Sequence, residues 1–239
     1  MRIDIYSSHR NINIKDIKER NVVVIDVLRT SSTLIGAFAN GLVRFLVVDD
    51  PIKAPDYTED LDNDRVLMGG VENYNFITGF DIGDSVFEYD RYAVKGKELI
   101  YYNRDSSPAI KKGYRGKRLF LGAFVNMHAV AEKLVELKDD VALVCAGTNG
   151  NFSLEDGLAA GGIIKEIRSF GIRPDLSEYA FVMDRMYSTY QNKLEDAIKR
   201  SITYEKLVHI GCEGDIEHAL KKNTYDFAPT LFDNWITKK

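Results

Sequence analysis

The stretch of the chain richest in chemically useful groups runs from Asp26 to Thr33. A carboxylate and a guanidinium are followed there by four hydroxyls at a predicted helix start: Thr30, Ser31, Ser32 and Thr33. The amides and the dipole at a helix N-terminus favour an anion, and Arg29 could hold a phosphate with its planar fork. Asp26 could hold a divalent cation that bridges to the same anion. Alternatively, a hydroxyl merely caps the helix while Asp26 pairs with Arg29, and this stretch alone leaves both interpretations open.

Two further stretches offer carboxylates. In Phe152–Asp156, a serine three residues before Asp156 fits a capping box, which favours a structural role. The functional alternative is that Glu155 or Asp156 turns inward as a metal ligand or general base. In Gly79–Ser85 the glycines and aspartates favour a turn for conformational reasons, and Asp81 as an oxygen ligand is the alternative.

Short apolar runs must position these residues. Asp26 follows the run Val22–Ile25, and Gly147 and Thr148 lie just beyond the run Val141–Val144. Both runs are continuous rather than alternating, which is typical of strands covered on both faces. In open α/β sheets, ligands bind beyond the carboxyl ends of the strands. Their position alone therefore makes Asp26, Gly147 and Thr148 candidate site residues.

Predicted strands and helices alternate along the chain. We expect further strands at Arg2–Tyr6, Phe45–Val48, Arg65–Met68, Glu98–Tyr102 and Arg118–Leu121, and helices at Ser32–Asn40, Asn126–Leu137 and Leu154–Phe170. This order predicts a three-layer α/β/α sandwich with a mostly parallel or mixed sheet. Residues 1–239 are expected to form one domain, divisible into packed halves of about 1–115 and 116–239. From about residue 175 onward we expect a mostly helical layer, and Gly69–Ser85 is expected to be an ordered loop.

Composition excludes several classes of protein. The chain has 239 residues, a formal net charge of -4, 45% hydrophobic and 28% charged residues, which are ordinary globular values. No apolar run approaches the length of a membrane span, and the first residues have a strand pattern rather than that of a signal peptide. The two cysteines, Cys145 and Cys212, are expected to be free thiols in a reducing compartment. The negative charge argues against nucleic acid as a partner.

Several common chemistries lack their motifs here. The chain has no glycine-rich phosphate loop, and its histidines have no zinc-type spacing. Asn151 stands six residues after Cys145, where cysteine phosphatases place an arginine, and Leu28 stands two after Asp26, where dehalogenase-type phosphatases place a second acid. A hard cation such as Mg²⁺, held by carboxylates, is therefore the cofactor we expect.

Several stretches, in order along residues 22 to 230, together resemble the 2-phosphosulfolactate phosphatases, or ComB-like proteins. They include Val24–Thr33, Gly79–Ser85, Gly122–Asn126, Val144–Thr148, Phe152–Asp156 and Asp215–Ile216. The resemblance implies a Mg²⁺-dependent phosphatase that hydrolyses 2-phospho-3-sulfolactate to 3-sulfolactate and phosphate, a step in coenzyme M biosynthesis. It also implies a cytoplasmic α/β protein that can form a homodimer.

The chain departs from the family pattern at four places. Val71 and Glu72 stand where a Glu-Arg pair is usual, and Asp84-Ser85-Val86 replaces Asn-Ser-Pro. The segment 102–107 replaces a Thr-Thr-Thr-Asn-Gly-Thr loop, which adds Arg104 and keeps two hydroxyls at Ser106 and Ser107. Near the end, Ala219 and Asn223 replace a cysteine and an aspartate. The alternative function is therefore a catalytically impaired family member that binds an anionic metabolite or acts as an assembly partner.

Our working hypothesis is metal-assisted hydrolysis of a small anionic phosphate ester, with neither nucleic acid nor membrane as partner. Asp26, with Asp81 or Asp156, would hold Mg²⁺, and Glu155 or Asp156 would orient or deprotonate the attacking water. Whether Asp26 attacks phosphorus itself stays open. Arg104 would face the second anionic group of the substrate. The other expected substrate contacts are Arg29, Thr30, Ser31, Ser32, Thr33, Ser106, Ser107, Asn126, Gly147 and Thr148.

Overall fold

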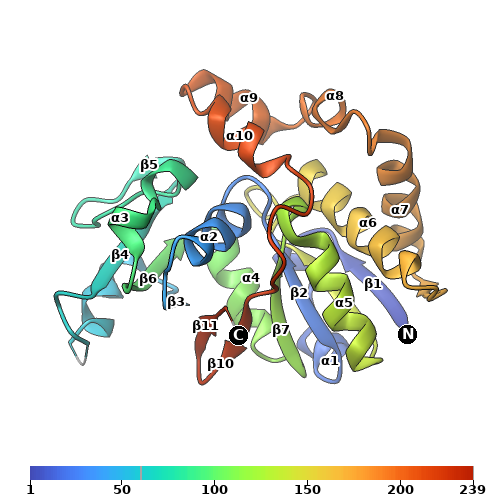
Figure 1. Ribbon diagram of the computed structural model, residues 1–239, viewed down its shortest axis with the longest axis horizontal. Helices are drawn as coiled ribbons and strands as arrows, with labels where there is room; N and C mark the ends of the chain where they lie inside the picture. Colours follow the sequence, from blue (N-terminus) through green and yellow to red (C-terminus); the bar gives the residue numbers. More distant parts are fainter. Residues whose placement is uncertain (60, 239) are drawn as a thin grey trace.

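One mixed β-sheet organises the protein, whose computed structural model describes residues 1–59 and 61–238 (Figure 1). In these residues the sheet has 11 strands in the order β5-β4-β6-β3-β11-β10-β7-β2-β8-β1-β9. The strands are β1 (Arg2–Tyr6), β2 (Asn21–Ile25), β3 (Arg44–Val47), β4 (Val66–Glu72), β5 (Asn75–Phe76), β6 (Glu98–Asn103), β7 (Arg118–Gly122), β8 (Val141–Cys145), β9 (Asp175–Leu176), β10 (Thr230–Phe232) and β11 (Trp235–Thr237). Strands from both sides of residue 115 are interleaved in this order.

The register of the central strands brings their carboxyl ends to one edge. Strand β2 runs parallel to both β7 and β8, with Ile25 opposite Gly122 on one side and Cys145 on the other. On the other half of the sheet, β6 runs parallel to β3 and to β4. All seven strands expected from the sequence are present, with ends that differ by a few residues. The loops that follow β2, β6 and β8 therefore meet at this edge.

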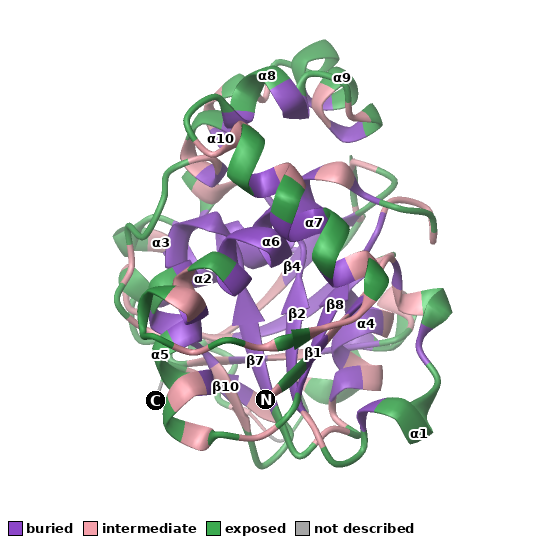
Figure 2. Ribbon diagram, turned by 90° about the vertical axis from the view of Figure 1, so that its right-hand side faces the viewer, coloured by how far each residue is buried: buried purple, intermediate pink, exposed green. Residues whose placement is uncertain are grey.

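Helices cover both faces of the sheet, which confirms the expected α/β fold class. Alternate residues of β2 belong to different cores: Val23 and Ile25 pack in the core that includes helix α6, whereas Val22 and Val24 pack in the core that includes α2 and α4. Figure 2 shows the buried strands with helices around them. The helices are α1 (Ile14–Ile17), α2 (Thr30–Ala39), α3 (Arg91–Val94), α4 (Ser106–Gly113), α5 (Met127–Leu137), α6 (Leu154–Ser169), α7 (Glu178–Tyr190), α8 (Leu194–Ile198), α9 (Ile202–His209) and α10 (Glu213–Ala219), with 3-10 turns at His9–Asn11, Pro51–Tyr57, Val86–Glu88 and Phe124–Asn126.

The C-terminal part of the chain differs from the expected helical layer. Helices α7 to α10 are present, but the chain then forms the hairpin β10–β11, which pairs antiparallel with β7 and β3. Its strands have three residues each, too few to show a periodic pattern in the sequence. Likewise, the stretch expected to be a loop from Gly69 starts as strand, because β4 continues to Glu72 and turns back into β5. Within the described residues, no helix is long and apolar enough to cross a membrane.

Close packing of α6 against α7 gives a test of the helical layer. Gly161 is buried, and a Cβ atom added there would lie 2.3 Å from the carbonyl oxygen of Met183 on α7. We expect Gly161→Ala to lower the free energy of unfolding by about 1–3 kcal/mol, because the two helices must separate. Urea denaturation measures the change. Ser169→Ala, at the exposed end of α6, is the matched control and should change stability by less than about 0.5 kcal/mol. Equal stability of the two variants would show that the helices do not pack this closely.

Candidate active site

A small cavity of about 40 Å³ lies at the edge where β2, β4, β6 and β8 end. Three carboxylates line it, from Asp26, Asp84 and Asp105, together with the side chain of Arg104. Gly147 and Thr148, expected from the sequence, line it as well. We call this cavity the acidic pocket. Asp26 comes from the loop after β2, Arg104 and Asp105 from the loop after β6, and Gly147 and Thr148 from the loop after β8.

Asp26 occupies the position that the sequence predicted, directly after β2. The residue is 7% exposed, and its backbone amide donates to the Ser31 hydroxyl at 3.0 Å. Burial raises the pKa of Asp26 to about 7, and the charges of Asp105 and Asp84 act in the same direction. Hydrogen bonds with the Ser106 and Thr30 side chains favour the ionised form but do not offset these effects. A carboxyl group with this pKa changes charge near neutral pH.

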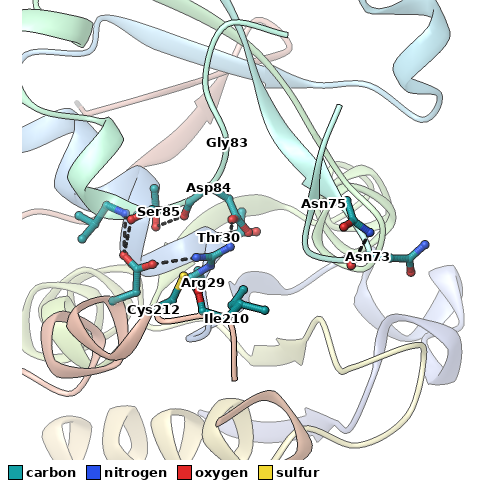
Figure 3. A network of polar contacts seen from close by, with 12 residues as sticks. Arg29, Thr30, Asn73, Asn75, Gly83, Asp84, Ser85, Ile210 and Cys212 are labelled. Carbon is teal, nitrogen blue, oxygen red and sulfur yellow. Dashed lines mark hydrogen bonds and ion pairs between the residues drawn. The ribbon is translucent and has the colours of Figure 1, made fainter. Parts of the chain in front are cut away.

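Arg29 holds together three separate segments of the chain. It is buried, its Nη1 donates to Oδ2 of Asp215 on α10 at 2.7 Å, and its Nη2 donates to Asp84 (Figure 3). The other Asp215 oxygen accepts from the Ser85 hydroxyl at 2.8 Å and from the Val86 amide at 3.0 Å. Burial and the Asp215 charge raise the pKa of Asp84 to about 6, against the opposing charge of Arg29. Arg29 does not line the acidic pocket, so the structure gives it carboxylate partners where the sequence suggested a phosphate.

The four hydroxyls after Arg29 are also engaged inside the protein rather than facing the pocket. All four residues are buried at the start of α2. Thr30 Oγ1 accepts from the Ser106 hydroxyl at 2.7 Å, and Thr33 Oγ1 donates to the carbonyl oxygen of Asp84 at 2.8 Å. The Ser32 hydroxyl donates to the carbonyl of Val27 at 2.8 Å. With the contact of Ser31 to Asp26, these bonds fix the loop after β2 and the loop that carries Asp84.

Asp156 joins the ends of two neighbouring strands. Its Oδ1 accepts from the amide of Val27 at 2.8 Å, and its Oδ2 accepts from the amide of Gly147 at 3.1 Å. The Asp156 amide in turn donates to the hydroxyl of Ser153, so the helix cap expected from the sequence is present. Burial, followed by the charge of Asp26, raises the pKa of Asp156 well above its usual range. Its carboxylate is therefore close to Asp26, as expected, but both oxygens bind backbone amides.

Several other candidates lie outside the acidic pocket. Asp81 is exposed and accepts from the amide of Met68 at 2.7 Å, so the structure shows the turn interpretation rather than a ligand beside Asp26. Asn126 is buried and accepts from the amide of Ala123 at 2.9 Å, which fixes the turn after β7. Ser107 Oγ accepts from the amide of Asn103, and Ser106 reaches the pocket only through its contacts with Thr30 and Asp26.

Sequence reasoning missed the carboxylates that complete the site. Asp84 and Asp215 were part of recognised stretches, but nothing in their spacing showed that they share Arg29. Asp105 accepts from the amides of Asn149 at 2.8 Å and Gly150 at 2.9 Å, which links the loops after β6 and β8. The usable signal was positional, because Asp105 follows a strand that ends at the same edge as β2.

Comparison with known proteins decides the family. A family model described as 2-phosphosulpholactate phosphatase matches residues 6–234. The chain belongs to this phosphatase family. Among relatives named "Probable 2-phosphosulfolactate phosphatase", that of Caldanaerobacter subterraneus subsp. tengcongensis is 34% identical over 233 residues, covering 97% of this chain and 95% of the relative. The relative from Clostridium tetani is 34% identical over 240 residues, covering all of both chains, and that of Thermotoga maritima is 34% identical over 212 residues, covering 89% of each.

Only some of the departures from the family pattern touch the acidic pocket. Val71, Asp84 and Arg104 line it. Asn223, in contrast, accepts from the amide of His128 on α5 at 2.8 Å and donates to Glu166 on α6 at 3.1 Å. The change at 223 therefore affects how helices are held, whereas the changes at 71, 84 and 104 affect the acidic pocket itself.

The raised pKa of Asp26 predicts a stability difference that depends on pH. Without added divalent cation, Asp26→Asn should be more stable than the wild-type protein at pH 8 by roughly 2–4 kcal/mol, since one pKa unit corresponds to about 1.4 kcal/mol. The folded protein binds the Asp26 proton more tightly than the unfolded chain, so the difference should grow as pH rises from about 4 to about 7 and then level off. Urea denaturation of both proteins at pH 5 and pH 8 measures it. A difference independent of pH would contradict the raised pKa.

Proposed function

We propose that this protein is a Mg²⁺-dependent phosphatase that hydrolyses 2-phospho-3-sulfolactate, or a related small phospho-hydroxy acid, to the free acid and phosphate. The observation that carries the proposal is the acidic pocket in a chain that belongs to a phosphatase family. Its carboxylates lie at the carboxyl edge of the sheet, where α/β proteins bind their ligands. Arg104 gives the same pocket a cation for an anionic substrate.

The residues of the pocket fit a divalent cation. Asp26, Asp84 and Asp105 face a shared space, and the unbalanced negative charge contributes to the raised pKa of Asp26. The described part of the chain contains no cluster of three or more acidic, histidine or cysteine side chains that could hold a metal ion by themselves. Mg²⁺, however, usually binds through one or two carboxylates together with waters and substrate phosphates. Asp26, with Asp84 or Asp105 as the second carboxylate, would hold it. When bound, Mg²⁺ would neutralise charge on the phosphoryl oxygens.

The protein's own side chains supply the remaining steps. Arg104 and the Thr148 hydroxyl, which line the acidic pocket, would bind phosphoryl oxygens. Of Asp84 and Asp105, the carboxylate that does not hold the cation can accept a proton from the attacking water and return it to the leaving alkoxide. Arg29 keeps Asp84 in position and is a positioning residue rather than a catalytic one. Asp156 holds the loops after β2 and β8 at a fixed distance from each other.

A phosphate-release assay with 2-phospho-3-sulfolactate tests this function. We expect activity with Mg²⁺, loss of activity with a chelator, and a loss of about 100-fold or more in kcat for Asp26→Asn, because the carboxylate that holds the cation is removed. Asp81→Asn is the matched control, since Asp81 is exposed and lies outside the pocket, and its activity should stay within twofold. Full activity of Asp26→Asn, or activity that does not depend on the cation, would overturn the assignment.

A further inference from the structure

The acidic pocket is much smaller than the substrate it would bind. About 40 Å³ accommodates only a few water molecules, whereas sites for small molecules usually exceed about 300 Å³. A second cavity of about 300 Å³ lies next to it, and we call this the distal cavity. Thr148 and Asn149 line both cavities. Glu155 and Arg200 line the distal cavity alone, so Glu155, expected from the sequence in the active site, lies on the other side of this shared wall.

Tyr74 is the residue of the acidic pocket that connects it to the distal cavity through its neighbours. It lines the acidic pocket, and its phenol lies near Thr203, which lines the distal cavity. Burial raises the pKa of this phenol, and the charges of Asp26 and Glu155, one from each cavity, add to the effect. The ring also lies 5.1 Å from the Lys206 ammonium on α9. The phenol therefore lies close to groups of both cavities.

Tyr74 stands at the tip of the β4–β5 hairpin in a conformation that suits glycine. The two-residue turn has φ of 52° at Asn73 and 67° at Tyr74, both in the left-handed region. Two-residue hairpin turns of this kind favour Asn-Gly, and a bulky residue at positive φ is uncommon. Contacts hold the tip in place: Arg104 donates to Asn73, and Lys206 lies over Tyr74. Figure 3 shows this tip beside the Arg29 and Asp84 cluster.

We propose that the distal cavity is the subsite for the anionic group that the ester carries besides its phosphate, a carboxylate or a sulfonate. Lys206 and Arg200 recognise this group. Tyr74 closes the passage between the two cavities until the substrate displaces it. This inference rests on the proposed phosphatase function. When Tyr74 moves, Lys206 loses its aromatic partner and can pair with a carboxylate or sulfonate instead. Arg200 is exposed at the wall of the same cavity.

Glu155 is the second sign that the distal cavity is built for a ligand. The residue is 1% exposed, and among the described residues its Oε2 has no hydrogen-bond partner. A buried polar atom without a partner is uncommon and calls for an explanation. Burial raises the pKa of Glu155, which weakens its repulsion of an anion. A ligand donor group bound in the distal cavity would give Oε2 a partner.

Activity on two esters distinguishes a loss of binding at the subsite from a loss at the catalytic centre. One is 2-phospho-3-sulfolactate, and the other is p-nitrophenyl phosphate, which has no second anionic group. Lys206→Gln should lower kcat/KM for the first ester about tenfold, since a charge-assisted contact is lost. For the second ester the loss in kcat/KM should be at least about five times smaller, that is, about twofold or less. Lys199→Gln is the matched control: it removes an exposed lysine near α9 that pairs with Glu195 and should change neither value. Equal losses on both esters, or no loss, would overturn the subsite.

Binding of 3-sulfolactate, measured by calorimetry, tests the role of Tyr74 without turnover. Tyr74→Gly suits the turn and removes the phenol, so it should bind the acid about three- to tenfold more tightly than the wild-type protein, because closure no longer competes. Lys206→Gln should bind it more weakly. Unchanged affinity in both variants would overturn the inference. Binding in this pattern without hydrolysis of any ester would overturn the proposed phosphatase function and leave the subsite standing.

Discussion

The active edge of this protein depends on an excess of buried negative charge. Among the described residues, Asp26, Asp84, Asp156 and Asp215 are buried there, and Arg29 is the buried cation that faces them. Burying an isolated carboxylate is costly unless it is paired, hydrogen-bonded or protonated. Arg29 pairs with Asp84 and Asp215, and backbone amides satisfy Asp156. Burial nevertheless raises the pKa of three of these carboxyls, to about 7 for Asp26, to about 6 for Asp84 and well above the usual range for Asp156.

The rest of the structure keeps this costly arrangement in place. Parallel pairing of β2 with β7 and β8 sets their ends level, and Asp156 ties two of the loops that follow. The hydroxyls of α2 connect the Asp26 loop to the Asp84 loop, and Asp215 brings α10 onto the same cluster. Because perturbed carboxyl groups gather where function needs them, this cost is typical of an active site. The apolar core on both faces of β2 stabilises the fold and offsets the free-energy cost of burying these carboxylates.

The sequence predicted the elements of the fold better than the directions of the side chains. Continuous apolar runs such as Val22–Ile25 located the strands, and the rule for parallel sheets then placed Asp26 and Thr148 at one edge. The partners of Arg29 could not be found this way, since Asp84 lies 55 residues and Asp215 lies 186 residues away along the chain. Hydroxyls at a helix start fit phosphate binding and internal bonding equally well, and only the packing of neighbouring loops decided for the second.

The same limit applies to Tyr74. A turn is usually recognised by its glycine, and here a tyrosine occupies that position because contacts with α9 hold it. Its importance follows from two cavities that share a wall, which no local pattern encodes.

The departures from the family pattern become intelligible at the same hairpin. Position 72, where the family pattern has an arginine, directly follows Val71, which pairs with Asn103 of β6. Position 104 is the next residue on the β6 side, so the arginine lost at 72 and the arginine gained at 104 are neighbours across two parallel strands. Arg104, just after β6, lines the acidic pocket and donates to Asn73 of the hairpin, whereas position 72 does not line this pocket. Since Arg104 binds Asn73 at the tip, the cation proposed to bind the substrate is in contact with the hairpin that carries Tyr74. This cation suits an anionic ligand, which both the proposed phosphatase and the impaired, metabolite-binding alternative require.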